Sequence, residues 1–183
     1  MRWRKQGKDD AIATDIAAMR RYARSLARDR QDADDIVQEA LVRAIERRRT
    51  FRPERSRRRW LLAIVHNVFV SGKRRAAAEA RRNARFAETL MAHIDPEQDR
   101  HVRLAQVAHA FAGLPDRQRA VLHLVAIEGL SYQEAADVLG VPVGTIMSRL
   151  ARARAALQRH EGGLADRKRE ESAGLRIVGG RDD

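Results

Sequence analysis

Apolar residues recur three or four positions apart in nearly every segment of the chain, and no segment shows the apolar–polar alternation of a β-strand. This spacing puts apolar side chains on one face of an α-helix. The first three stripes are Ile12, Ile16, Met19, Ala23 and Leu26; Ile36, Val37, Leu41, Ala44 and Ile45; and Trp60, Leu61, Ile64, Val65 and Val68. The spacing therefore predicts an all-α fold.

A segment with few large apolar residues divides the chain. It runs from Ala76 to about Arg103 and consists largely of Ala, Arg and Glu, which favours a connector without a core of its own. We predict two small helical domains, at residues 11–76 and 104–160, joined by a linker at residues 77–103. Residues 161–183 mix Gly with both charge signs and are predicted to be a disordered tail, whose "GLRIV" segment could dock on a partner.

The charge balance indicates a polyanionic partner. The chain has 37 Lys and Arg against 25 Asp and Glu, a formal net charge of +12. Nucleic acid is the leading interpretation, and an anionic membrane surface is the rival. No apolar run approaches the roughly 20 residues that span a bilayer, and the N-terminus lacks an apolar signal core, so we expect a cytoplasmic protein without membrane insertion.

Composition also limits the chemistry. The absence of cysteine excludes disulfides, a thiol nucleophile and Cys-ligated zinc. The six histidines are scattered, so we expect no metal site. We predict no catalytic residue and no cofactor.

A helix-turn-helix is predicted at residues 130–157. Ser131 and Glu134 have capping-box spacing, Gly140 supplies the turn, and Pro142 lies near the start of the second helix. That helix has an apolar stripe of Ile146, Leu150, Ala153 and Leu157, and a polar face of Thr145, Ser148, Arg149 and Arg152. Short donors and arginines on one helix suit a DNA major groove. The alternative is a helical hairpin whose arginines form a solvated face.

The stretch "DADDIVQEAL", residues 32–41, is acidic in a basic chain. We expect Asp32 to be a helix N-cap. Asp35, Gln38 and Glu39 fall at i, i+3 and i+4 and share one face. Complementation of the helix dipole explains the first acids, but not the face formed by Gln38 and Glu39. A Mg²⁺ site is disfavoured because no phosphate-binding loop accompanies the acids.

Three segments together resemble a known family. They are "DADDIVQEALVRAIE", "TFRPERSRRRWLLAIVHNVFVSGKRR" and "LPDRQRAVLHLVAIEGLSYQEAADVLGVPVGTIMSRLARARAAL". In this order they resemble the bacterial sigma-70 family, specifically its extracytoplasmic-function (ECF) group, over residues 11–160. The first domain is similar to sigma region 2, and the second is similar to sigma region 4. "RRYARSLARD" and "HNVFVSGKRR" look like the branch linked to general stress responses in proteobacteria.

The resemblance implies partners for each surface. Asp35, Gln38 and Glu39 would bind the β′ clamp helices of core RNA polymerase, and the polymerase β flap and an anti-sigma factor are further implied partners. The implied contacts to the unpaired −10 promoter strand are Phe51, Arg58, Asn67, Ser71, Arg74 and Arg75. The implied contacts to the −35 duplex are Thr145, Ser148, Arg149 and Arg152. Met147 departs from the family, whose members often have Arg or Lys there.

Some roles stay open. Cations for the −10 strand are available at Arg55, Arg57, Arg58, Arg59, Lys73, Arg74 and Arg75. Phe51 either stacks on a base or plugs its loop, Thr50 to Arg59, onto the core, whereas Trp60 is expected in the core.

The resemblance therefore predicts a promoter-specificity subunit that melts DNA through binding energy and has no catalysis of its own. The rivals are a sigma-mimic module that titrates an anti-sigma factor, and a stand-alone helix-turn-helix regulator. A mimic has no need of the basic second helix. A stand-alone regulator leaves the acidic stretch and the Asn67 face without a role.

Overall fold

The computed structural model describes residues 3–27, 29–52, 56–83 and 108–174, with side chains described within 11–82 and 108–159. Its helices are α1 (Trp3–Leu26), α2 (Arg30–Glu46), the short 3₁₀ helix η1 (Arg48–Thr50), α3 (Arg57–Asn83), α5 (Asp116–Leu122), the π-helical turn η2 (His123–Ile127), α6 (Tyr132–Leu139) and α7 (Val143–Gly174). Residues 108–112 are also helical. The described ranges contain no strand, which confirms the all-α prediction.

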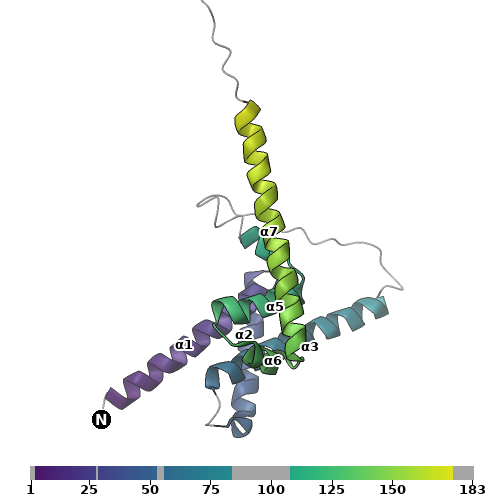
Figure 1. Ribbon diagram of the computed structural model, residues 1–183. Helices are drawn as coiled ribbons and strands as arrows, with labels where there is room; N and C mark the ends of the chain where they lie inside the picture. The colour runs from purple at the N-terminus through teal and green to yellow at the C-terminus, as the bar shows by residue number, and fades with distance from the viewer. Residues whose placement is uncertain (1–2, 28, 53–55, 84–107, 175–183) are drawn as a thin grey trace, which may run out of the picture.

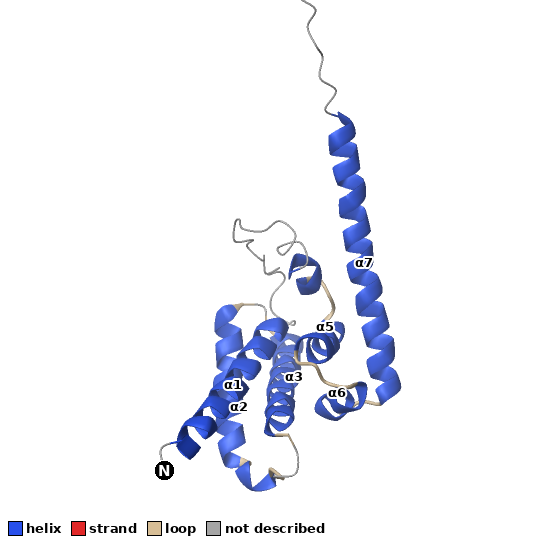
Figure 2. Ribbon diagram, turned by 60° about the vertical axis from the view of Figure 1, so that its left-hand side comes forward, coloured by secondary structure: helices blue, strands red, loops and turns tan. Residues whose placement is uncertain are grey.

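Helices α1, α2 and α3 pack against one another and form the N-terminal unit (Figure 2). Met19, Tyr22 and Leu26 of α1 and Leu62 and Val65 of α3 are almost completely buried in its core. Burial of such side chains contributes about 1.5–3 kcal/mol each, so this packing, rather than local helix propensity, stabilises the bundle.

The acidic helix α2 begins earlier than predicted. Its N-cap is Asp29, whose side chain accepts a hydrogen bond of 2.8 Å from the backbone N–H of Asp32. The prediction of Asp32 as the cap was therefore wrong. Arg30 and Gln31 are good helix formers and extend the first turn back to Asp29.

Two residues of the predicted apolar stripes are exposed. Ile12 is 42% exposed because it lies one turn before Asp15, where burial begins among the described side chains of α1. Ile45 is 65% exposed because the buried face of α2 runs through Val37, Ala40 and Ala44. A residue directly after Ala44 is rotated about 100° from that face.

Helices α5, η2, α6 and α7 form the C-terminal unit, which contains the predicted helix-turn-helix. The capping box is present, because Ser131 accepts from the N–H of Glu134 and Glu134 accepts from the N–H of Ser131. Gly140 ends α6 with a φ of +62°, a conformation that strongly favours glycine. Ile146, Leu150 and Ala153 of α7 are buried, as the spacing predicts.

The two units pack on each other, which the sequence did not predict. Helix α3 contacts α6, and α1 contacts both α5 and η2, so one continuous core runs through both units (Figure 1). Arg119 of α5 donates to the carbonyl of Leu26 at the end of α1, with N–O 3.2 Å. We call this packing the closed arrangement.

Two helices extend past the predicted domain limits. Helix α3 continues to Asn83, beyond residue 76, and α7 continues to Gly174, through most of the segment predicted to be a disordered tail. Ala, Arg, Lys and Glu are abundant in both extensions and have high helix propensity. None of the helices in the described ranges combines the length and the hydropathy that crossing a bilayer requires.

Candidate nucleic-acid interface

The outward face of α3 presents the predicted strand-binding residues. Asn67 and Arg74 are exposed and Ser71 is half-buried, so the three positions point away from the core. Before α3, the Phe51 ring lies 5.3 Å from the Trp60 ring, between centroids, at an interplanar angle of 48°. Phe51 therefore packs on the edge of the core in the closed arrangement, and Trp60 packs against the core as expected.

Three cations of α3 are paired with acids of the C-terminal unit. Arg58 forms an ion pair with Glu128, and Lys73 forms one with Asp116. A guanidinium nitrogen of Arg59 lies 3.1 Å from a carboxylate oxygen of Glu134. Two more predicted cations pair within the N-terminal unit, Arg57 with Asp15 and Arg75 with Glu39. Arg55 lies outside the described residues. Carboxylates of the protein are thus paired with five of the cations that the sequence predicted for the −10 strand.

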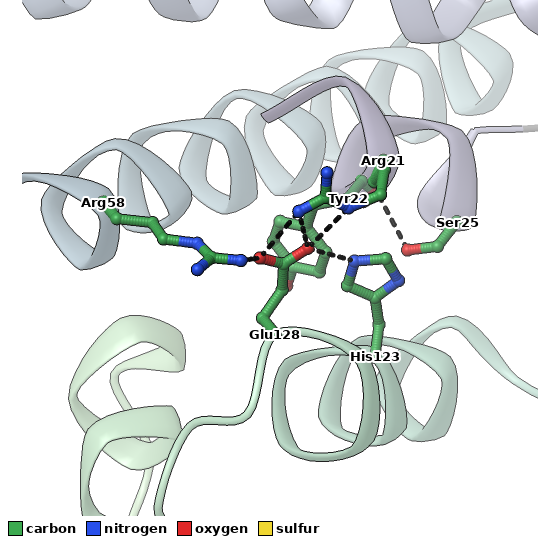
Figure 3. Close-up of polar contacts among 6 residues, drawn as sticks. All are labelled: Arg21, Tyr22, Ser25, Arg58, His123 and Glu128. Carbon is green, nitrogen blue, oxygen red and sulfur yellow. Dashed lines mark hydrogen bonds and ion pairs between the residues drawn. The ribbon is translucent and has the colours of Figure 1, made fainter. Parts of the chain in front are cut away.

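Glu128 is the centre of the contact between the units (Figure 3). Its side chain is completely buried and accepts hydrogen bonds from Arg21 of α1, at 3.2 and 3.4 Å, and from Arg58 of α3. His123 Nε2 lies 3.4 Å from Glu128 Oε1. Since a buried carboxylate is costly without partners, Glu128 specifies how the two units meet.

Tyr22 of α1 contacts one histidine of its own unit and one of the C-terminal unit. Its hydroxyl lies 3.1 Å from His66 Nδ1 of α3, and its ring lies 5.2 Å from the His123 ring of η2, between centroids. Burial raises the pKa of Tyr22, so the hydroxyl stays protonated. Burial and the positive charge of Arg149 lower the pKa of His66 to about 4, which keeps the imidazole neutral near pH 7.

The helix-turn-helix residues are divided between solvent and the space between the units. Arg152 and Met147 are exposed, Thr145 is half-buried, and Ser148 donates to the carbonyl of Thr145 at 3.1 Å. Arg149 is half-buried and lines a cleft together with Arg74 of α3. The structure therefore brings one predicted −35 residue and one predicted −10 residue into a single cleft.

The acidic face of α2 is directed outward. Asp35 and Gln38 are exposed, and Glu39 is half-buried. Glu39 Oε1 accepts from Arg43 at 2.6 Å and from Arg75 at 3.3 Å. Two of the three predicted side chains are thus open to a partner, and the third is held by neighbouring arginines. Among the described residues, no group of three or more His, Asp or Glu side chains could hold a metal ion.

Sequence reasoning missed Glu128, His123 and Tyr22. Glu128 follows the apolar run "HLVAI", and an acid in that position is typical of the solvated end of a helix. It is buried because α1 packs on η2 and Arg58 of α3 reaches its carboxylate. The sequence contains no local signal that would have identified it.

The fold and these surfaces define a class: an all-α helix-turn-helix protein with a second, cation-rich helical unit. Residues 14–79 match the family model described as Sigma-70 region 2, and residues 104–157 match Sigma-70, region 4. The chain is 37% identical over 151 residues to the ECF RNA polymerase sigma factor EcfG of Rhodopseudomonas palustris, covering 82% of each chain. It is 42% identical over 131 residues to the ECF RNA polymerase sigma factor SigC of Mycobacterium tuberculosis, covering 68% of each.

A solved structure has the same fold. The sigma factor RpoE from Bartonella quintana, in complex with the anti-sigma factor NepR, matches with a TM-score of 0.70 and 30% identity, over 86% of this chain and 98% of that one. The chain belongs to the sigma-70 family of RNA polymerase sigma factors, in the ECF group. It is a promoter-directing subunit for core RNA polymerase, as the resemblance predicted.

Proposed function

We propose that each predicted surface of this sigma factor has one task. The Asp35, Gln38 and Glu39 face binds the polymerase β′ clamp helices, α3 holds the melted −10 strand, and the α7 face binds the −35 duplex, with the β flap as a further contact of the C-terminal unit. The observation that supports this most is the outward exposure of Asn67 and Arg74 on a helix whose inner face is fully packed.

On α3, Asn67 supplies donors and an acceptor for a base edge, while Arg58, Arg74 and Arg75 neutralise the strand backbone, with Ser71 between them. Phe51 is next to this face and can leave Trp60 to stack on a base. The protein has no catalytic step in this role, because each captured base offsets part of the cost of unstacking the duplex.

On α7, Thr145 and Ser148 donate near the helix N-terminus, while Arg149 and Arg152 reach guanine edges or phosphates. Met147 has neither a hydroxyl donor nor a positive charge, so it contributes no polar contact to the −35 duplex. Because Arg149 lines the cleft against α3, the two units must separate before both DNA faces are free. Core polymerase, which binds α2, is the partner that would hold them apart.

Partners and compartment complete the proposal. The solved relative is bound to an anti-sigma factor, and we extend such a partner to this chain as the protein that holds it inactive. We place the chain in the cytoplasm, where core polymerase acts, and in the general-stress branch that the sequence resembles.

Asn67→Ala is expected to lower run-off transcription from the protein's own promoter by about tenfold, the equivalent of one hydrogen-bonded base contact. Binding to core polymerase should be unchanged, because α2 is intact. Gln158→Ala, which removes an exposed amide of α7 outside the proposed contacts, is the matched control and should keep parent activity. Equal loss of transcription and polymerase binding in Asn67→Ala would remove the role assigned to Asn67.

A further inference from the structure

A cleft of about 650 Å³ separates α3 from the C-terminal unit. Helix α3 contributes Lys73, Arg74 and Arg81, α5 contributes Arg117, and α7 contributes Arg149. Its volume lies within the range of small-molecule sites. The cleft is thus built from both units and exists only in the closed arrangement.

The acids of the described residues do not balance the positive charge in the cleft. Among these residues Asp116 is the only acid in the lining, and it binds Lys73. Among the described residues, Arg74, Arg81, Arg117 and Arg149 have no ion-pair partner. Like charges close together repel one another, and burial and the positive charges of Arg117 and Arg152 lower the pKa of Arg149 accordingly. An anion with several charges would relieve this repulsion.

Apart from His66, the remaining lining is apolar. Phe69, Val70, Ala120, Leu139 and Val141 form a surface beside the cations. Inorganic phosphate would contact only the arginines. A flat ring with phosphates attached would contact the arginines and the apolar surface. Nucleotides combine these features, because arginine binds phosphate in a bidentate manner and an apolar surface accepts a base.

We infer that the cleft is a binding site for a free nucleoside polyphosphate, which links α3 to α5 and α7 and stabilises the closed arrangement. A DNA strand offers the same base and phosphate chemistry. The free ligand is favoured because the cations of both units converge on one cleft, whereas an extended strand would run past it. The inference does not depend on the residue roles proposed above.

Titration calorimetry of the full chain with guanosine diphosphate tests the site. We expect saturable binding of one nucleotide per chain and a higher Tm in its presence. Arg117→Ala should weaken binding about tenfold, the value of one charged phosphate contact. Ala77→Glu, which puts an acid into the lining at an exposed helix position, should weaken it at least as much. Arg24→Ala, an exposed arginine of α1 outside the lining, should not.

Three results would overturn the inference. Absence of binding, or equal weakening in all three variants, would show unspecific attraction to a basic protein. Pyrophosphate that binds as tightly as guanosine diphosphate would show that the apolar surface contributes nothing. A short single DNA strand that binds in a cleft-dependent manner while the free nucleotide does not would identify the cleft as part of the DNA path.

Discussion

Replacing Glu128 with alanine is expected to lower the free energy of unfolding by about 3 kcal/mol. The Glu128 side chain is completely buried, and its removal leaves Arg21 and Arg58 without the carboxylate that holds them between the units. The loss is at the lower end for a buried ion pair because Arg21 and Arg58 are 46% and 34% exposed and recover some hydration. Urea unfolding measures the change.

The same substitution should open the closed arrangement, because Glu128 connects η2 to both α1 and α3. Small-angle scattering should then report a larger radius of gyration at urea concentrations where helicity is still that of the parent. Glu79→Ala, which removes an exposed acid of α3, is the matched control and should change stability by less than about 0.5 kcal/mol. A Glu128→Ala variant as stable and as compact as the parent would contradict the role of this carboxylate.

Stability is expected to fall steeply as the pH drops from about 6.5 towards 4. The pKa of His66 is lowered from 6.5 to about 4 by burial and by Arg149, and burial also lowers the pKa of His123 despite the adjacent Glu128 carboxylate. Between these pH values the two histidines bind protons in the unfolded chain but not in the folded chain, so the free energy of unfolding rises with pH. Each histidine contributes a slope of up to about 1.4 kcal/mol per pH unit.

Urea unfolding at a series of pH values measures this slope. His66→Gln should flatten the slope, and the part that remains comes from His123. Gln158→Ala, which removes an exposed side chain of α7 that does not titrate, should leave it unchanged. Stability that is constant between pH 4 and 6.5 would show that the two imidazoles titrate as they do in the unfolded chain, contrary to their burial beside Tyr22.

Local features of the fold could be predicted because they depend on neighbours in sequence. The spacing of Ile146, Leu150 and Ala153 indicated the buried face of α7, and Ser131 with Glu134 indicated its partner helix. The error at Asp32 arose because several acids in a row offer alternative caps, and only backbone geometry selects Asp29.

Contacts between the units could not be predicted, because they join residues far apart in sequence. Arg58 and Glu128 are 70 positions apart, and Arg21 and Glu128 are 107 apart. The sequence indicated cations on α3 and a basic α7. It did not indicate that carboxylates of the C-terminal unit would form ion pairs with the cations of α3. Arg149 was expected on the DNA-binding face of the helix-turn-helix, and the packing of the two units placed it in a cleft.

Co-elution with core RNA polymerase is the most direct test of the central claim, that α2 connects this sigma factor to the enzyme. The parent should co-elute as a stable complex, and a variant with Gln38→Ala and Glu39→Ala should not. A variant with Glu79→Ala and Gln158→Ala removes the same two side-chain types elsewhere and should co-elute like the parent. Failure of the parent to co-elute, or co-elution of the Gln38 and Glu39 variant at parent level, would contradict the account.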